Sequence, residues 1–263
     1  MHPDAITLHL DRELTLKADE TVLVAPSSRQ AGPFWAVSAN PSRLPCGDLV
    51  GSDTGTPFFR ALNTVWLPGK FAMEPGCFLR CLRDMALEPG DHGLACWKEG
   101  PSLATIALSD RAHAGTREDA SGPLIQELVG AELALAHSQR YTLPDEPSAL
   151  KSLLHHLALE QRMDLILTTG GTGLTSRDIT PDATQGVLDR DLPGFEQAMM
   201  AASLAKTPQA VLSRARAGIL GRSLIINLPG SRRAVRDNLE AVLPALKHAL
   251  DKIADDPGEC GNE

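Results

Sequence analysis

The chain has few aromatic residues and no long hydrophobic run. Only 4% of its 263 residues are aromatic. No stretch approaches the roughly 18 consecutive apolar residues of a transmembrane helix, and the first residues lack the basic and apolar segments of a signal peptide. We therefore expect a cytoplasmic protein that makes no membrane contact.

The sequence also lacks an excess of positive charge. It has 25 Lys and Arg residues against 33 Asp and Glu, a net charge of −8 and a pI near 5.5. Non-specific binding of nucleic acid normally relies on a basic surface, so no nucleic-acid partner is expected. The length and a hydrophobic content of 43% fit two small globular domains better than one large one.

Cysteine is scarce, and the five residues are Cys46, Cys77, Cys81, Cys96 and Cys260. An odd number in a chain without export signals predicts free thiols rather than a disulfide framework. Cys77 and Cys81 could share one face of a helix. Cys96 with the nearby His92 makes only a loose ligand set, so ordinary buried or surface thiols are favoured over a zinc site.

Composition and pattern change near Gly100. The first hundred residues are rich in proline, contain all three tryptophans and show short β-type runs at residues 5–10, 13–17, 21–25 and 34–38. Prolines and glycines interrupt residues 40–76 so densely that we expect no long helix before residues 77–87. Residues 1–100 are thus predicted to form a small β-rich domain of uncertain role.

From residue 101 to 255 the pattern alternates between strand and helix. Strands are expected at 103–108, 133–140, 165–168 and 223–227, and helices from 122 and over 149–162, 181–190, 193–206 and 231–254. This alternation predicts a three-layer α/β fold, a mostly parallel sheet with helices on both faces. In such sheets ligands bind outside the carboxyl ends of the strands. Residues 256–263 are predicted to be a flexible tail.

A glycine-rich turn, Thr168-Thr169-Gly170-Gly171-Thr172-Gly173, follows the apolar run 165–167. Three glycines within four residues leave backbone N–H groups open to an anion. Thr180 as N-cap, Pro181 at the first helical position and Asp182 in the first turn then predict a helix start, which suits a phosphorylated ligand. The run is neither a P-loop nor a dinucleotide fingerprint, and a plain strand-to-helix crossover is the alternative.

Leu228-Pro229-Gly230-Ser231 is a second candidate anion site, because it lies between an apolar run and a helical pattern. Arg232 and Arg233 favour a phosphate or carboxylate ligand there, and a simple Pro-Gly turn is the competing interpretation. Asp178 lies just beyond the first glycine turn with Arg177 beside it. That carboxylate could bind a metal or orient a phosphate.

Eight short motifs occur in order along residues 103–254: Ser109-Asp110-Arg111, Gly115-Thr116-Arg117-Glu118-Asp119-Ala120-Ser121-Gly122-Pro123, Pro144-Asp145-Glu146, the glycine run, Arg177-Asp178-Ile179-Thr180-Pro181-Asp182-Ala183-Thr184, Pro193-Gly194-Phe195, Leu212-Ser213-Arg214 and Asn227-Leu228-Pro229-Gly230. Together they closely resemble the Mog/MoaB family of molybdopterin adenylyltransferases, which is related to the G domains of plant and animal molybdenum-cofactor proteins.

The resemblance implies an enzyme of molybdenum cofactor biosynthesis in which the terminal phosphate of molybdopterin attacks the α-phosphate of Mg-ATP, giving adenylylated molybdopterin and pyrophosphate. It implies that Asp145 and Asp178 are the essential carboxylates and hold Mg²⁺. Nucleotide phosphates would lie against Gly170, Gly171, Thr172 and Gly173, and molybdopterin against Ser109, Asp110, Ser213, Pro229, Gly230 and Ser231. It further implies a homotrimer and a partner protein that inserts the metal, molybdenum or tungsten.

Local interpretations of these residues stay open. Asp145 could only cap the helix that begins near Pro147, Asp178 could only fix its turn through bonds to the backbone, and Ser213 could be a helix cap. Two rival functions also remain. One is a non-catalytic molybdopterin or cofactor carrier, and the other is a nucleotide hydrolase of the competence-protein type.

Two features depart from the family pattern. Arg232 stands where the family often has proline, which leaves substrate contacts at that turn open. Residues 71–91 faintly resemble the closing segment of MOSC domains, β-rich modules associated with molybdenum-cofactor sulfur chemistry, and Cys46 would then be a candidate sulfur-carrying thiol. The rival interpretation is a β-rich extension that mediates oligomer contacts or shields the pterin.

Overall fold

The computed structural model describes residues 6–26, 35–38, 44–68 and 73–254, so the predicted tail at 256–263 and Cys260 lie outside the described residues. The chain divides into two compact units, Met1–Gly100 and Pro101–Glu263. Within the described ranges, no helix has both the length and the apolar character needed to cross a membrane.

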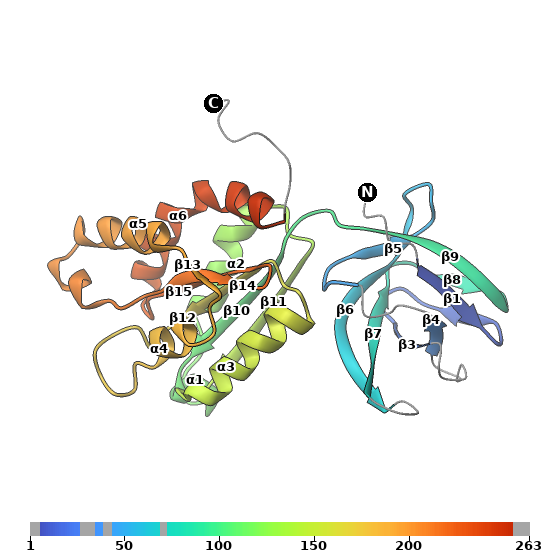
Figure 1. Cartoon of the computed structure of the whole chain (residues 1–263), viewed down its shortest axis with the longest axis horizontal. Helices are drawn as coiled ribbons and strands as arrows, with labels where there is room; N and C mark the ends of the chain where they lie inside the picture. Colours follow the sequence, from blue (N-terminus) through green and yellow to red (C-terminus); the bar gives the residue numbers. More distant parts are fainter. Residues whose placement is uncertain (1–5, 27–34, 39–43, 69–72, 255–263) are drawn as a thin grey trace. The chain divides into compact units, whose positions relative to one another are not determined.

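The first unit is a closed β-barrel with the strand order β1-β4-β3-β7-β6-β5-β9, and β2 and β8 pair separately (Figure 1). Neighbouring strands are antiparallel except β3 and β4, which are parallel. The strands are β1 Ile6–Leu10, β2 Leu14–Leu16, β3 Thr21–Pro26, β4 Trp35–Ser38, β5 Leu49–Gly51, β6 Pro57–Pro68, β7 Met73–Cys81, β8 Met85–Leu87 and β9 Gly90–Trp97.

No helix forms over residues 77–87, the earliest place where the sequence allowed one, because this segment contains the end of β7 and all of β8. Cys77, Leu79 and Cys81 are fully buried, whereas the residues between them are less so. That period of two is typical of a strand with one face in the core. Cys77 and Cys81 do share a face, but it is the inner face of a strand.

The cysteines of the barrel are core residues. Cys46, Cys77, Cys81 and Cys96 are buried free thiols, which confirms this part of the thiol prediction. The pairing of β6 with β7 shifts register between Ala61 and Asn63, and the carbonyl of Leu62 at this bulge accepts a hydrogen bond from the Cys46 Sγ at 2.6 Å. Burial raises the pKa of Cys77 to about 12, so its reactive thiolate form is scarce near neutral pH. A sulfur-carrying role of Cys46 stays a prediction.

The second unit is the predicted α/β fold: one mixed, mostly parallel sheet of order β11-β10-β12-β15-β14-β13. The first four strands are parallel, and β14 and β13 extend the sheet antiparallel. The strands are β10 Ser102–Leu108, β11 His137–Leu143, β12 Leu165–Thr169, β13 Arg190–Asp191, β14 Ala217–Leu220 and β15 Ser223–Leu228; the helices are α1 Asp110–His113, α2 Ser121–Glu132, α3 Pro147–His155, α4 Thr180–Gln185, α5 Pro193–Leu204 and α6 Arg232–Ile253.

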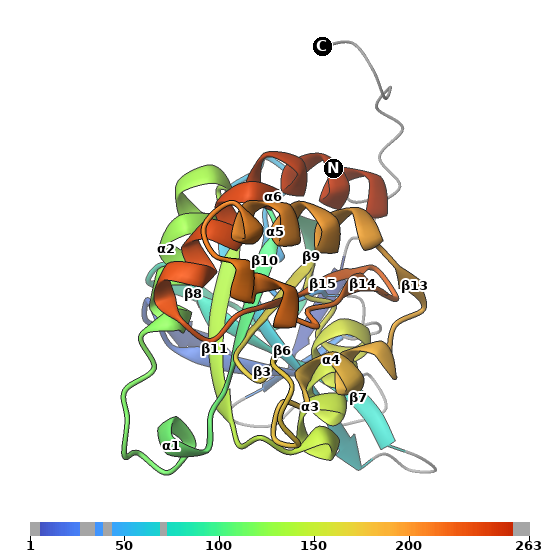
Figure 2. The same ribbon diagram turned by 90° about the vertical axis from the view of Figure 1, so that its left-hand side faces the viewer.

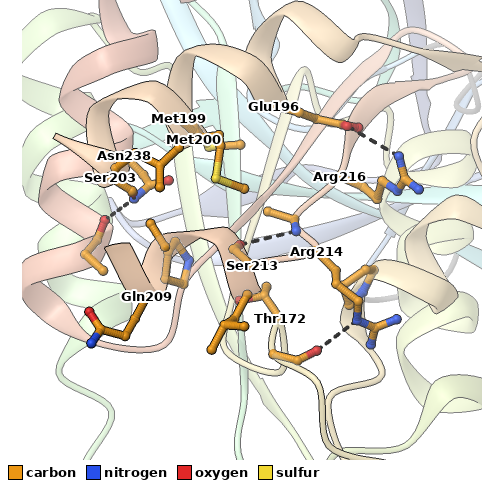
Figure 3. A pocket seen from close by; sticks show the side chains of 18 of the residues that line it. Thr172, Glu196, Met199, Met200, Ser203, Gln209, Ser213, Arg214, Arg216 and Asn238 are labelled. Carbon is orange, nitrogen blue, oxygen red and sulfur yellow. Dashed lines mark hydrogen bonds and ion pairs between the residues drawn. The ribbon is translucent and has the colours of Figure 1, made fainter. Parts of the chain in front are cut away.

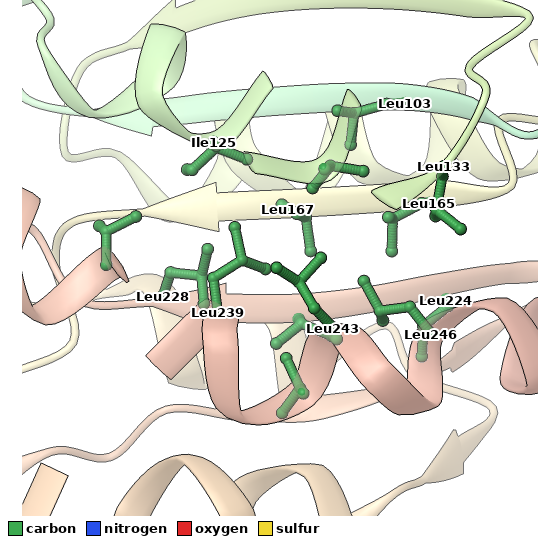
Figure 4. Close-up of a cluster of buried hydrophobic side chains, with 14 of the residues drawn as sticks. Leu103, Ile125, Leu133, Leu165, Leu167, Leu224, Leu228, Leu239, Leu243 and Leu246 are labelled. Atoms are coloured by element: carbon green, nitrogen blue, oxygen red, sulfur yellow. The ribbon is translucent and has the colours of Figure 1, made fainter. Parts of the chain in front are cut away.

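Helices cover both faces of this sheet. Helices α2, α5 and α6 lie on one face and α3 and α4 on the other (Figure 2). Strands β10, β12 and β15 are buried along their whole length, as expected for parallel strands that are covered on both sides. Their leucines pack against α2 and α6, including Ile125, Leu239 and Leu246 (Figure 4). This packing holds the carboxyl ends of the central strands in one place.

Several element boundaries differ from those expected. The helix at 149–162 ends as α3 at His155 and continues as a π-helical turn, His156–Glu160. The helix at 181–190 stops at Gln185, because Gly186 is its C-cap and the chain then enters strand β13. The hairpin of β14 and β15 was missed, although Gly221, with φ +59°, supplies the left-handed turn residue between them.

Candidate functional site

Four parallel strands end at the same edge of the second sheet, and candidate site residues follow each of them. Ser109 follows β10, Asp145 comes two residues after β11, Gly170 follows β12 and Pro229 follows β15. Strand order places the β10 and β12 ends side by side, with the β15 end next to β12. The topology therefore brings together residues that are up to 120 positions apart in the sequence.

The first glycine turn has a backbone that only glycine adopts easily. Gly170 and Gly171 have φ values of +96° and +62°. A Cβ at Gly170 would lie 2.5 Å from the carbonyl oxygen of Leu108. Thr180 closes the turn: its Oγ1 donates to the Gly170 carbonyl at 2.8 Å, and its N–H donates to the Gly171 carbonyl at 3.1 Å.

The prediction that Thr180 is the N-cap of the following helix is wrong. Helix α4 begins at Thr180 itself, and Ile179 occupies the N-cap position without a side-chain capping bond. The reason is that the Thr180 hydroxyl donates to the glycine turn instead of accepting from the helix N–H groups. Pro181 remains within the first turn, where its missing N–H costs no hydrogen bond.

The second turn contacts the first directly. The Gly170 N–H donates to the Leu228 carbonyl at 3.2 Å, and Thr169 Oγ1 donates to the Pro229 carbonyl at 2.7 Å. At Gly230 a Cβ would lie 3.4 Å from the Gly170 Cα. Ser231 is the N-cap of α6, its Oγ accepting from the N–H of Ala234 at 3.3 Å. The two predicted anion sites are thus adjacent.

A cavity of 560 Å³ opens at these two turns. It is lined by Ser109, Gly170, Gly171, Gly230 and Ser231, and by the arginines Arg117 and Arg232. The N-terminal end of α2 contributes Ser121, whose Oγ donates to the Gly230 carbonyl at 3.2 Å. The N-termini of α2 and α6 and two guanidinium groups favour a phosphate group in this cavity, although the carboxylates of Glu118 and Asp119 also line it.

A second cavity, of 880 Å³, is lined in part by the last residues of the glycine turn (Figure 3). Thr172, Gly173, Ser213 and Pro229 are among its walls. Ser213 ends the 3-10 helix Pro208–Leu212, and its Oγ accepts from the N–H of Ala215 at 3.4 Å. The remaining walls mix apolar and polar side chains, among them Met199, Met200, Leu204, Glu196, Arg216 and Asn238.

Two carboxylates and one arginine meet near the ends of β10 and β11. Asp110 Oδ1 accepts a hydrogen bond from the N–H of Asp145 at 2.9 Å. The guanidinium of Arg177 forms an ion pair with Asp110 and lies 3.7 Å from Asp145 Oδ2. Asp145 does not cap the next helix, since Glu146 is at the N-cap of α3 and no side-chain capping bond forms. Its carboxylate lies beside the Arg177 guanidinium instead.

Asp178 has a clear structural task as well. Its Oδ2 accepts hydrogen bonds from the N–H of Thr175 at 2.8 Å and from the Thr175 Oγ1 at 2.6 Å. A Cβ at Gly173 would lie only 2.9 Å from the same oxygen. The turn-fixing bonds considered from the sequence are therefore present. These two hydrogen bonds orient the carboxylate of Asp178. A catalytic role of this carboxylate stays a prediction.

The two carboxylates have opposite pKa shifts. Hydrogen bonds from Thr175 are the main reason that the pKa of Asp178 lies below its usual value, and the charge of Arg214 adds to the effect. Burial is the main reason that the pKa of Asp145 lies above its usual value, and the negative charge of Asp178 raises it further. The pair is thus close enough to interact electrostatically, as carboxylates that share a cation do.

We expect the Asp145→Asn variant to be more stable than the wild type near pH 7. The folded pKa of Asp145 is raised, so ionising this carboxylate in the folded state costs free energy above that pKa. This free-energy cost disappears as the pH falls below the pKa that Asp145 has in the unfolded chain, because its carboxyl group is then protonated in both the folded and the unfolded protein. Urea unfolding at pH 7 and at pH 3 measures this; a variant that is less stable at pH 7 contradicts it.

Several residues of this site were not predicted from the sequence. Arg117, Arg216, Glu196 and Asn238 line the cavities but were given no role, and Arg214 was quoted only as part of a motif. Asp110, Asp145 and Asp178 are absent from the described walls of both cavities. The sequence predicts one set of residues for the nucleotide and another for the pterin. Each cavity is lined by residues from both sets, so the division between them stays a prediction.

Comparison with known protein families identifies the family to which this chain belongs. The model of a family described as "Probable molybdopterin binding domain" matches residues 104–248. The chain belongs to this family. Residues 1–103 fall outside the matched segment, so membership in the molybdopterin-binding domain family describes the second unit only.

Relatives of this molybdopterin-binding domain include named enzymes. The molybdopterin adenylyltransferase of Helicobacter pylori J99 is 43% identical over 152 residues, which are 57% of this chain and 86% of the relative. The solved structure of the molybdopterin biosynthesis enzyme MoaB from Thermus thermophilus is 42% identical, with a TM-score of 0.55, covering 60% of this chain and 99% of that one. The tungsten cofactor synthesizing protein MoaB from Pyrococcus furiosus is 32% identical, with a TM-score of 0.51, covering 60% and 99%.

Proposed function

We propose that the second unit is a molybdopterin adenylyltransferase that acts in molybdenum cofactor biosynthesis. The observation that carries this proposal is the contact between the two glycine turns, which puts a cavity with two arginines and two helix N-termini next to a larger cavity of mixed polarity. Two substrates that both carry phosphate need two such neighbouring sites. Relatives about 40% identical bear the name of this activity.

In the proposed reaction, an oxygen of the terminal phosphate of molybdopterin attacks the α-phosphorus of ATP. A new P–O–P bond forms, the bond between the α-phosphorus and the bridging oxygen breaks, and pyrophosphate leaves with that electron pair. We assign the nucleotide phosphates to Gly170, Gly171, Thr172 and Gly173, and molybdopterin to Ser109, Asp110, Ser213, Pro229, Gly230 and Ser231. Catalysis of this type depends mainly on positioning and charge neutralisation.

Asp145 and Asp178 fit a magnesium ion that arrives with the nucleotide. Burial and, to a smaller extent, the charge of Asp178 raise the pKa of Asp145, and a cation beside both carboxylates would offset that penalty. Magnesium usually takes one or two carboxylates together with substrate phosphates and water. Among the described residues, no three His, Cys, Asp or Glu side chains form a group that could hold a metal ion. When bound, magnesium would neutralise charge on the transferring phosphate.

Incubation of the purified chain with molybdopterin, magnesium and ATP tests the proposal. We expect adenylylated molybdopterin and pyrophosphate in equal amounts, and neither when any of the three components is left out. Pterin binding without either product would instead support the non-catalytic carrier. Turnover of a nucleotide without any pterin would support the hydrolase.

The remaining assignments follow from the same resemblance. We propose a homotrimer, a location in the cytoplasm and a partner protein that inserts the metal. We also propose that residues 1–100 form a β-rich domain of separate role, MOSC-like or an oligomer contact, and that residues 101–255 form the catalytic domain. Light scattering on the purified chain measures the oligomeric state.

A further inference from the structure

Arg214 connects the wall of the larger cavity to the loop that carries Asp178 (Figure 3). Its Nε donates to the Gly173 carbonyl at 2.8 Å and its Nη2 to the Asp178 carbonyl at 2.5 Å. Its Nη1 reaches both carboxylate oxygens of Asp182, at 3.0 and 2.9 Å. Its own N–H donates to the Thr172 carbonyl at 3.0 Å.

These bonds join three parts of the chain. Gly173 belongs to the glycine turn, Asp178 to the loop after it, and Asp182 to the first turn of α4. A planar guanidinium can serve all three at once, because its N–H groups point in fixed and different directions. A lysine ammonium in the same place could keep the charge beside Asp182 but not this geometry.

The carboxylate and the backbone of Asp178 are thus held by different groups. Thr175 orients the carboxylate through two hydrogen bonds, whereas Arg214 holds the carbonyl of the same residue. Arg214 is also part of the cavity wall next to Ser213. A ligand that fills this cavity therefore touches the side chain that fixes the position of Asp178.

We propose that Arg214 is a positioning residue for adenylyl transfer, coupling occupancy of the larger cavity to the placement of Asp178. This inference rests on the proposed function. The guanidinium need not touch the reacting phosphates, since it acts through the backbone of residues 173–178.

The test compares Arg214→Lys and Arg214→Gln with Arg236→Gln. Arg236 forms an ordinary surface pair with Glu240 at 3.4 Å on α6 and lines neither cavity, so its variant is the matched control. We expect Arg214→Lys to lower kcat by about 100-fold, with the KM for ATP and the Kd for molybdopterin changed by less than about threefold. Its Tm should stay closer to the wild type than that of Arg214→Gln, because the charge beside Asp182 is kept. Arg236→Gln should keep wild-type kcat.

If Arg214 only stabilised the fold, its variants would give different kinetic and thermal results. The kcat per folded molecule would then stay at the wild-type level in both Arg214 variants, and only Tm would fall. That result, or full rescue of kcat by lysine, overturns the proposal.

Hydrogen exchange tests the positioning role without any turnover. The amides of Thr175 and Asp178 form hydrogen bonds within the loop, and both should exchange faster in Arg214→Lys while the amides of β12 keep their wild-type rates. Unchanged exchange in the loop overturns the proposal. If the wild-type chain makes no adenylylated pterin, the proposed function fails, and the exchange result alone decides the role of Arg214.

Discussion

The Asp178→Asn variant is expected to transfer adenylyl groups about 10²- to 10³-fold more slowly than the wild type, while its fold and its affinity for molybdopterin are kept. The reason is the loss of one of the two negative charges that we assign to magnesium. An asparagine oxygen still accepts hydrogen bonds, so the contacts from Thr175 can be kept in part. The rate of pyrophosphate release and equilibrium binding of molybdopterin are the measurements.

The Thr175→Ala variant distinguishes two contributions of Asp178: its negative charge, and the hydrogen bonds by which it holds the turn. This change removes the bond from the Thr175 hydroxyl but keeps the bond from the backbone N–H and the full charge of Asp178. We expect it to slow adenylyl transfer by about tenfold, the lower end of the effect of losing one hydrogen bond to a charged group, because the bond from the backbone N–H is kept. Near-normal turnover in Asp178→Asn would remove this carboxylate from the mechanism. Equal losses in both variants would show that it only shapes the turn.

The α/β unit could be predicted from the sequence because its signals are local. The apolar runs at β10, β12 and β15 are buried strands, and the glycines after β12 mark a turn whose backbone requires them. Each of these features depends on neighbouring residues only. The place of the site, outside the carboxyl ends of the strands, then follows from the general rules for open parallel sheets.

The β-rich unit was harder to predict, because barrel closure depends on pairing between distant strands. Strand β1 pairs with β9, more than 80 residues away. The segment from residue 77 was left open between helix and strand for a related reason: an apolar run of this length fits either, and only the pairing of β7 with β3 and β6 decides between them.

Arg214 shows that local sequence patterns do not reveal hydrogen bonds between residues that are distant in the sequence. Its side-chain partners lie 32 to 41 residues earlier in the sequence. An arginine after a serine in a loop carries no local signal of such bonds. By contrast, Asp178 was singled out by its position just after the glycine turn, and the motifs around Asp145 and Asp178 resemble those of a known family.

We expect the Gly170→Ala variant to lose about 2–4 kcal/mol of unfolding free energy in the second unit. Gly170 has a φ of +96°, a conformation that is costly for alanine. The added Cβ would also lie 2.5 Å from the Leu108 carbonyl oxygen, which is main chain and cannot rotate away. The turn would have to open, and with it the contact to the Pro229–Gly230 turn. Adenylyl transfer should therefore fall as well.

The chain offers a way to follow each unit separately. All three tryptophans lie in the first unit, whereas the helices of the described residues all lie in the second. Urea unfolding followed by far-UV circular dichroism should therefore shift for Gly170→Ala, with tryptophan fluorescence reporting the barrel. Gly194→Ala in α5 is the matched control, because its Cβ would meet no atom within 4 Å, and it should be neutral or gain up to about 0.5 kcal/mol. An unshifted dichroism transition in Gly170→Ala would mean that the turn tolerates a side chain and that its glycine is not needed for the fold.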